Sequence, residues 1–309
     1  MTTWTDAYNH LTTTVWASIK TLEKRSQVAH HLVTLLGPKA RCRNLTQAKI
    51  DQVKTQLAKG VGGRRRISPS SLRQYLGVLS KLVSVARDLD PAVPPVKMNR
   101  PPAVREDRVI LTREDEVAII DALEPAARAA RWHRPYTGAP KPGLSEKLPE
   151  FLRFGWWIKF MLATGMRPSE SFKIRKEDLT IRDAERERWL LHIPETKSGQ
   201  PRSIPLEPQA REAWKACEPY GLWSDYEYER VKGRFWDPIL AAAPITTRYT
   251  MYCLRHTYIT RRIEAGMPID QLSRLVGHSR IDQTMEYVHR SEESKFQAVE
   301  ALERVNQPA

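Results

Sequence analysis

Residues 64–90 carry the clearest repeat of hydrophobic and polar positions in the chain. Hydrophobic side chains recur there every three or four positions, as on the buried face of an α-helix. Ser68 can cap the first turn, and Pro69 suits the first helical position. We therefore predict a helix whose buried stripe consists of Leu72, Tyr75, Leu76, Leu79, Leu82, Val83 and Ala86. The rest of the first hundred residues is also predicted to be helical.

A proline-rich stretch follows at residues 90–107 and contains five prolines. This composition predicts an extended, semi-rigid linker, so we place the boundary between two domains here. Thr112 is predicted to cap the next helix, which has acidic residues in its first turn. Residues 131–149 contain Pro and Gly without a period, which predicts a long surface loop.

The second half mixes helical and strand patterns. Residues 151–179 predict a buried helix, which ends at Gly165, and then a second helix. Residues 188–206 alternate between hydrophobic and polar positions on both sides of a polar turn. This alternation predicts a β-hairpin with Lys197 near its tip.

The composition excludes several classes of protein. Hydrophobic residues make up 41% of the chain, and no hydrophobic run approaches the 18 or so residues of a membrane-spanning helix. The N-terminus has no charged segment followed by a hydrophobic one, so we expect no secretory signal. The three cysteines lie far apart, which argues against a disulfide framework or a zinc site and favours a reducing cytoplasm.

Positive charge is concentrated in the first hundred residues. The chain has a net charge of +14, and residues 1–100 hold 17 Lys and Arg against 5 Asp and Glu. Such a field favours binding to phosphate backbones, although a merely soluble or ribosome-associated basic protein would share it. For the individual basic side chains of this region, the alternative to a DNA contact is a place on a solvated, positively charged surface. The candidate DNA contacts here are Arg64, Arg65, Arg66, Arg73 and Lys81.

Several residues of the second half suit phosphate chemistry, although each has a simpler explanation when taken alone. Arg167 lies at a predicted helix start, where guanidinium and helix N-terminus both bind phosphate oxygens, and Glu170 can orient it. Such a pair is more often only a cap or salt bridge. A tyrosine at helical spacing, such as Tyr287, usually packs. His256 and His289 are expected to pack or to lie on the surface.

Together the residue types fit one reaction. A phenol has a pKa near 10 and needs positive neighbours to act as a nucleophile. Arg167 and Arg255 can bind the non-bridging oxygens of a phosphodiester that Tyr287 attacks, with His278 as a further donor. Lys197 can protonate the leaving 5′-oxygen. The sequence has no acidic cluster for a metal and no glycine-rich nucleotide loop, so we expect no metal and no cofactor.

At this point the sequence resembles the tyrosine recombinase (phage-type integrase) family. The matching segments follow in order across residues 111–290 and are LTREDE, ATGMRPSES, TKSGQPRSIPL, LRHTYIT and LVGHSRIDQTMEYVH. The resemblance implies a mainly α fold. A helical core-binding domain (residues 1–100) is joined by the proline-rich linker to an α+β catalytic domain (residues 107–309) with a small antiparallel sheet.

The resemblance also implies a set of site residues. Tyr287 would form a 3′-phosphotyrosyl link to DNA, Glu170 matches the acidic position that supports the first arginine, and Arg202 is a further candidate DNA contact. The implied catalytic residues are Arg167, Lys197, Arg255, His278 and Tyr287. Because the core-binding helices are predicted to begin near the N-terminus, we expect no additional arm-binding domain.

One position departs from the family pattern. Members usually carry His or Lys three residues before the second arginine, where this chain has Tyr252. A phenol is not an ordinary general base near neutral pH, so the group that accepts the Tyr287 proton stays open, with His278 or solvent as alternatives. Attack by Tyr252 itself is rejected, because one helical turn from Arg255 leaves no space for a phosphate in line.

The leading hypothesis is a site-specific DNA recombinase or integrase that acts as a homo-tetramer on two double-stranded DNA sites. The alternatives are a type IB-like topoisomerase, which works as a monomer, and a non-catalytic DNA-binding regulator. Residues 291–307 predict a short amphipathic helix. The resemblance suggests that this helix docks on a neighbouring subunit, and folding back on its own domain is the alternative.

Overall fold

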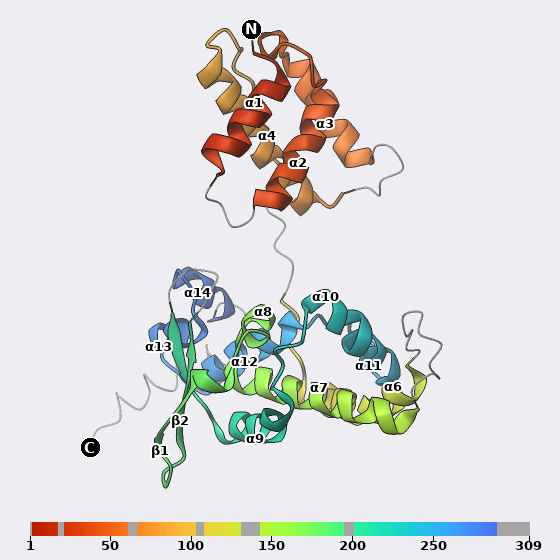
Figure 1. The fold of residues 1–309 in the computed structure, drawn as a ribbon, viewed down its shortest axis with the longest axis vertical. Helices are drawn as coiled ribbons and strands as arrows, with labels where there is room; N and C mark the ends of the chain where they lie inside the picture. Colours follow the sequence, from red (N-terminus) through yellow and green to blue (C-terminus); the bar gives the residue numbers. More distant parts are fainter. Residues whose placement is uncertain are drawn as a thin grey trace, which may run out of the picture. The chain divides into compact units, whose positions relative to one another are not determined.

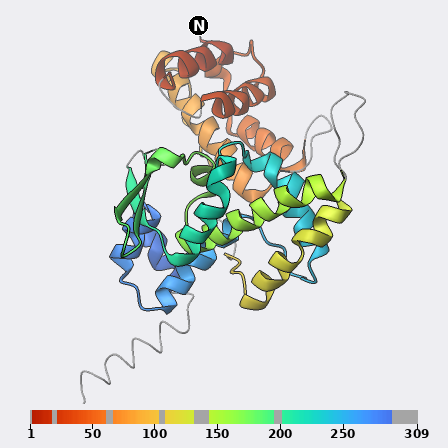
Figure 2. The same cartoon turned by 60° about the horizontal axis from the view of Figure 1, so that its bottom comes forward.

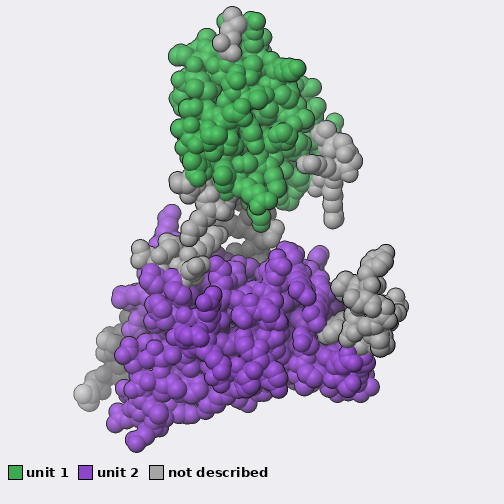
Figure 3. All heavy atoms as spheres, in the orientation of Figure 1, with its two compact units in different colours: residues 1–107 green, residues 108–309 purple. Residues whose placement is uncertain are grey.

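The computed structural model describes residues 2–17, 22–60, 67–102, 108–130, 143–194 and 201–288. The chain forms two compact units, residues 1–107 (unit 1) and 108–309 (unit 2), which Figure 3 shows in different colours. Each unit encloses a hydrophobic cluster of its own, as an independent domain requires.

Unit 1 is a bundle of helices in which α4 (Pro69–Leu89) packs against the other three (Figure 1). The predicted cap is present, because the Ser68 hydroxyl accepts a hydrogen bond from the Ser71 N–H at 3.1 Å. The predicted stripe faces the core and is fully or partly buried along its length. The remaining elements are α1 (Trp4–His10) with a π-helical turn (Leu11–Val15), α2 (Leu22–Leu36), a 3₁₀ turn (Cys42–Asn44) and α3 (Gln47–Lys59).

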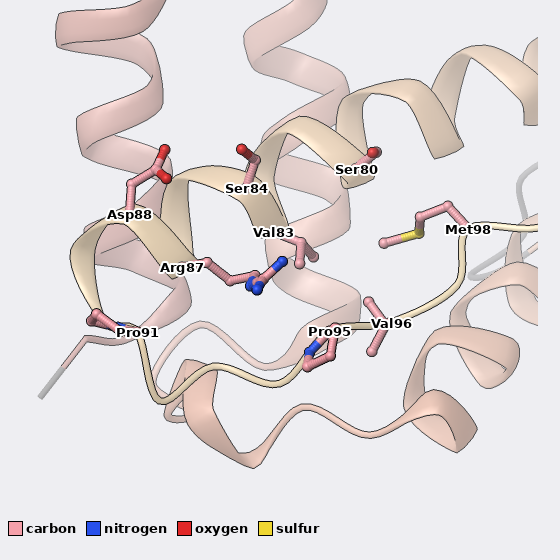
Figure 4. Close-up of a pocket in the computed structure, with 9 residues that line it drawn as sticks. All are labelled: Ser80, Val83, Ser84, Arg87, Asp88, Pro91, Pro95, Val96 and Met98. Atoms are coloured by element: carbon pink, nitrogen blue, oxygen red, sulfur yellow. The ribbon is translucent and has the colours of Figure 1, made fainter.

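The proline-rich stretch after α4 turns back along unit 1. Val93 is buried, and Val96 and Met98 pack against the core. Figure 4 shows the space between α4 and this stretch, which Val96 and Met98 help to line. Apolar side chains between the prolines therefore fasten the stretch to the bundle.

Hydrogen bonds fasten the same stretch further along. The Gln47 Oε1 accepts from the Lys97 N–H at 2.9 Å, and its Nε2 donates to the Lys97 carbonyl at 3.2 Å. Arg73 donates to the Pro101 carbonyl at 2.8 Å. The unpacked linker predicted over residues 90–107 is therefore too long, since its first part belongs to unit 1. Residues 103–107 lie outside the described part of the chain.

Unit 2 combines helices with one small sheet, which confirms the mainly α prediction with an α+β second half (Figures 1 and 2). α7 (Leu144–Thr164) packs against α6, α9 and α12 and supplies much of the core. The other helices are α5 (Arg113–Asp121), α6 (Leu123–Ala129), α8 (Pro168–Ser171), α9 (Pro208–Cys217), α10 (Tyr228–Val231), α11 (Asp237–Ala242), α12 (Tyr252–Glu264), α13 (Ile269–Val276) and α14 (Asp282–Val288).

The sheet is antiparallel with strand order β1-β2-β3. The predicted hairpin is present as β2 (Arg188–Ile193) and β3 (Arg202–Pro205), which pair from Leu190 opposite Pro205 to Ile193 opposite Arg202. The edge strand β1 (Leu179–Asp183) was not predicted. Its alternation is too weak to see in the sequence because all three central residues are exposed.

α7 begins earlier than predicted. The sequence pattern favours a loop up to residue 149, yet the helix starts at Leu144 and includes Pro149. A proline inside a helix removes one backbone hydrogen bond, and for that reason it normally signals the end of a helix. Leu144 and Leu148 pack against the core, so tertiary burial outweighs the local penalty.

No helix in the described ranges has the length and apolar character needed to cross a membrane.

Gly165, which ends α7, has a matched partner for a stability test. Gly165 and Gly266 both have a positive φ, +60° and +76°. A Cβ at Gly165 would lie 2.2 Å from the Tyr258 ring, whereas a Cβ at Gly266 would have no atom within 4 Å. We expect Gly266→Ala to lower the free energy of unfolding by about 1 kcal/mol through backbone strain, and Gly165→Ala to lower it by about 3 kcal/mol. Urea unfolding of both variants measures this, and equal decreases would show that the Tyr258 ring moves aside freely.

Candidate active site

Four predicted catalytic residues come from separate elements of unit 2. Arg167 precedes α8, Arg255 lies on α12, His278 lies in the turn between α13 and α14, and Tyr287 lies on α14. Figures 1 and 2 show α13 and α14 together at one end of α7. Lys197, at the hairpin turn, lies outside the described residues.

The C-terminus of α13 binds three arginines. The last carbonyls of a helix have no partner within it and carry the negative end of its dipole, so they attract cations. Here three consecutive carbonyls each accept a hydrogen bond from a different guanidinium. The pairs are Arg202 Nε with Leu275 at 3.0 Å, Arg255 Nη2 with Val276 at 2.8 Å and Arg167 Nη2 with Gly277 at 3.0 Å.

Glu170 joins two of these arginines. Its Oε1 lies 2.8 Å from Arg167 Nη1 and its Oε2 lies 2.8 Å from Arg202 Nη2, and only 4% of Glu170 is exposed. The expected contact between Glu170 and Arg167 is thus present. Burial works to raise the pKa of Glu170, but the hydrogen bond and charge of Arg202, with those of Arg167, outweigh it and hold this pKa below its usual range.

Arg202 was expected to contact DNA, and its geometry does not fit that role. Its side chain is 8% exposed, and its guanidinium is bound to Glu170 and to the Leu275 carbonyl. The sequence offered no sign of this, because an arginine at the start of a strand looks like any surface charge. The contacts favour a supporting role for Arg202, in which it fixes Glu170.

Arg255 is 3% exposed and lies between two helix ends. Besides Val276, it donates from Nη1 to the Gly165 carbonyl at the end of α7, at 2.7 Å. Burial, together with the neighbouring charge of Arg167, lowers the pKa of Arg255 to about 9. The guanidinium is therefore still charged at neutral pH, and a bound anion would stabilise that charge further.

His278 directly follows the arginine-binding carbonyls. Its Nδ1 lies 2.7 Å from the hydroxyl of Thr284, a fully buried residue of α14. Burial and the charges of the surrounding arginines, Arg255 first among them, lower the pKa of His278 to about 3. A neutral imidazole has one protonated ring nitrogen, and in the tautomer in which Nδ1 accepts from Thr284 the proton lies on Nε2, where it can donate to an anion.

Tyr287 is 4% exposed, and its phenol is surrounded by nitrogen-containing side chains. Its hydroxyl lies 2.7 Å from His256 Nδ1, and the Arg108 guanidinium lies 4.3 Å from its ring centre. The His278 ring is nearly parallel to it, with centroids 6.4 Å apart. Burial raises the pKa of Tyr287, and the charges of Arg108 and Arg255 offset only part of that shift.

Sequence reasoning missed two of these neighbours. His256 was expected to pack or to lie on the surface; it packs against the Tyr287 ring and also contacts the Tyr287 hydroxyl. Its position directly after Arg255 was the one available signal. Arg108 also binds Glu286 and donates to the Gln283 carbonyl at 3.3 Å, so it holds α14 from a position far away in sequence. His289 lies outside the described residues.

Tyr252 lies at the start of α12 with 38% of its surface exposed. Its ring packs against Tyr228, with centroids 6.2 Å apart. Its hydroxyl therefore belongs to a more open environment than that of Tyr287.

The predicted basic residues of unit 1 are only partly described, since Arg64, Arg65 and Arg66 lie outside the described residues. Arg73 is bound to the Pro101 carbonyl. Lys81 lines a groove between α2 and α4, which we call the Trp16 groove. Its lining residues are Trp16, Lys24, Arg25, Val28, Gln74, Gly77, Val78 and Lys81.

The described side chains include no group of three His, Cys, Asp or Glu placed to hold a metal ion. What they do form is an anion site. Three buried or half-buried arginines face a single carboxylate, so the cluster keeps net positive charge beside a phenol. Such a cluster can bind a phosphodiester and stabilise the negative charge of its transition state.

Glu170 should dominate the stability of this cluster. We expect Glu170→Gln to lower the free energy of unfolding at pH 7 by about 3 kcal/mol, because two arginines lose a buried partner. As the pKa of Glu170 is depressed in the folded state, the wild-type advantage is complete above its ordinary value of 4.5 and shrinks as the pH falls below it. Urea unfolding at several pH values tests this.

Glu124→Gln is the matched control, because the Glu124–Arg128 pair is 51% and 63% exposed and should contribute below about 0.5 kcal/mol. A similar small decrease for Glu170→Gln would mean that the buried cluster contributes nothing beyond a surface pair.

Comparisons with known proteins agree with this geometry. Residues 145–294 match the phage integrase family. A probable integrase/recombinase of Aquifex aeolicus is 27% identical over 175 residues, which cover 47% of this chain and 55% of the relative. A tyrosine recombinase of Pseudothermotoga lettingae is 24% identical over 202 residues, which cover 54% of this chain and 66% of the relative. The chain thus spans about half to two thirds of these relatives.

Solved structures share the fold at low identity. The Tn1549 transposon integrase, in complex with circular intermediate DNA, has a TM-score of 0.67 and 15% identity, with 97% of this chain and 99% of that chain covered. A lambda integrase dimer bound to a COC′ core site has a TM-score of 0.64 and 15% identity, with 92% and 93% covered. Residues 145–294 thus carry the phage integrase family domain, and the solved structures show that the chain has the fold of these integrases.

Proposed function

We propose that this protein is a site-specific DNA recombinase that cleaves and rejoins strands through a 3′-phosphotyrosyl intermediate at Tyr287. The observation that carries the proposal is the row of carbonyls at the end of α13, which fixes three arginines in one cluster, and one of them, Arg255, is near enough to the buried phenol to affect its pKa. The names of the relatives and the DNA in the solved complexes support the same activity.

Each residue takes a role that its surroundings support. Arg167 and Arg255 bind the non-bridging oxygens, where negative charge develops, and neutral His278 donates a further hydrogen bond. Glu170 and Arg202 hold Arg167 in place and do not touch the substrate. Lys197 protonates the leaving 5′-oxygen, a role that rests on the family resemblance alone. The reaction conserves the energy of the phosphodiester in the tyrosyl ester, so it needs neither metal nor nucleotide.

Double-stranded DNA is the proposed partner, and unit 1 adds affinity for it. The Trp16 groove is lined by Lys24, Arg25 and Lys81, and also by Gly77, where a Cβ would meet no atom within 4 Å beyond its own stretch of helix. A phosphate can approach a helix closely at such a glycine. We further propose a homo-tetramer on two sites, acting in the cytoplasm, with the predicted C-terminal helix docked on a neighbouring subunit. That helix lies outside the described residues.

Removing one oxygen tests the nucleophile. We expect Tyr287→Phe to keep DNA affinity and to abolish the covalent adduct, because only the attacking atom is removed. Substrates are duplexes with a nick and randomised flanks, from which wild-type adducts are trapped in denaturing detergent and sequenced. Tyr252→Phe, the control, should still form the adduct.

The outcomes of this test separate the candidates. Adducts with Tyr287→Phe but not with Tyr252→Phe would reassign the nucleophile to Tyr252, and no adduct with wild type would leave a non-catalytic DNA-binding regulator. Strand exchange between two labelled duplexes distinguishes a recombinase from a topoisomerase, which relaxes supercoils without exchange.

The Trp16 groove predicts a change in salt dependence. Lys24→Gln and Lys81→Gln should each flatten the slope of log affinity against log salt, by up to about 0.9 for each phosphate that the variant no longer neutralises. Affinity for a duplex of random sequence, measured at several salt concentrations, provides the slope. Lys59→Gln, at the end of α3 and outside the groove, should leave it unchanged. If all three variants keep the wild-type slope, the DNA is bound elsewhere, for example at residues 64–66.

A further inference from the structure

His256 is hydrogen-bonded to the oxygen that would attack, and it can accept a proton, whereas Arg108, which also bonds to this phenol, is already a cation. His256 lies on α12 directly after Arg255, and α12 packs against α14, which carries Tyr287. His256 Nδ1 is 2.7 Å from the Tyr287 hydroxyl, and the two ring centroids are 5.8 Å apart. A hydrogen bond of this length places a nitrogen where it can accept the phenol proton directly.

The phenol needs such an acceptor. Its pKa is raised by burial, so the hydroxyl keeps its proton at neutral pH even with Arg108 and Arg255 nearby. A protonated phenol is a weak nucleophile, and the proton must leave as the bond to phosphorus forms. A fixed acceptor is therefore more effective than water, which has little access to a side chain that is 4% exposed.

The other candidates are placed less well. The Nδ1 of His278 is already bound to Thr284, and its low pKa makes it a poor proton acceptor. Arg108 is a cation that lies over the face of the phenol and binds Glu286. Tyr252 carries a phenol itself and packs against Tyr228. Among the described side chains, this leaves His256 in position for the transfer.

We propose that His256 is the general base of the cleavage step, a role that rests on the proposed function of Tyr287. As the Tyr287 oxygen bonds to phosphorus, its proton passes to His256 Nδ1. The bond from phosphorus to the 5′-oxygen breaks, and that oxygen takes the electron pair and a proton from the general acid. In rejoining, the 5′-hydroxyl attacks phosphorus and gives its proton back to the deprotonated general acid, while His256 returns its proton to the departing Tyr287 oxygen.

The proposed proton transfer requires one particular tautomer of His256. Its Nδ1 must be unprotonated before cleavage, so that the phenol donates and the imidazole accepts, and its hydrogen then lies on Nε2. Asparagine is the informative replacement, because its amide oxygen can accept a hydrogen bond near the position of Nδ1 but cannot take up a proton. His256→Asn thus keeps the hydrogen bond and removes the chemistry, whereas His256→Ala removes both.

The test measures adduct formation in a single turnover on the duplex selected with wild type. We expect His256→Asn and His256→Ala to be slowed alike, by about 10² to 10⁴-fold, with DNA affinity unchanged. His10→Asn, in unit 1, is the matched control and should react at the wild-type rate. If His256→Asn reacts nearly as fast as wild type while His256→Ala is slow, His256 only positions the phenol and the proposal fails.

A more acidic phenol provides a second readout that a structural role would not affect. With trifluorotyrosine at position 287, the phenol loses its proton with less help from a base. This replacement should therefore raise the rate of His256→Asn about tenfold more than it raises the rate of the protein with His256 intact. An equal effect on both proteins would overturn the base role. No adduct with wild-type protein would instead overturn the proposed function, and the two failures are thus distinguishable.

Discussion

The geometry of the site depends on the C-terminus of one short helix. α13 ends with three carbonyls that no residue within the helix can satisfy, and each binds a different arginine. Arg167 lies between α7 and α8, Arg202 on β3 and Arg255 on α12. The end of α13 therefore fixes side chains that are far apart in sequence. Peptide dipoles cannot rotate away once packed, and the positive charges are therefore placed before any anion binds.

Two glycines make this arrangement possible. Gly277 ends α13 in a left-handed conformation, and a Cβ there would lie 2.7 Å from Arg202 Nη1. Gly165 ends α7 in the same way and presents its carbonyl to Arg255. Glu170 then supplies one negative charge between two arginines, which limits their repulsion but leaves the cluster positive. The backbone conformation at the two glycines and the negative charge of Glu170 thus both help to hold the arginines together.

Local patterns predicted much of the fold. The stripe and cap of α4 and the hairpin of β2 and β3 were visible because their periods and capping residues act within a few positions. The early start of α7 at Leu144, the edge strand β1 and the packing of Val96 on unit 1 were not, since each depends on burial against distant residues. The same limit applies to the site. Arg202 and His256 look ordinary in sequence, and their partners are set by tertiary contacts.

The positions of residues along α12 bear on the unusual Tyr252, which stands where family members usually carry His or Lys. Position 252 begins the helix, and position 256 follows one turn later on the same face. A phenol at 252 cannot act as an ordinary base, but a histidine one turn further along contacts the Tyr287 hydroxyl directly. The charge environment favours this arrangement. In the proposed step the imidazole gains a positive charge only when it accepts the proton, and at that moment the attacked phosphate gains the negative charge that offsets it.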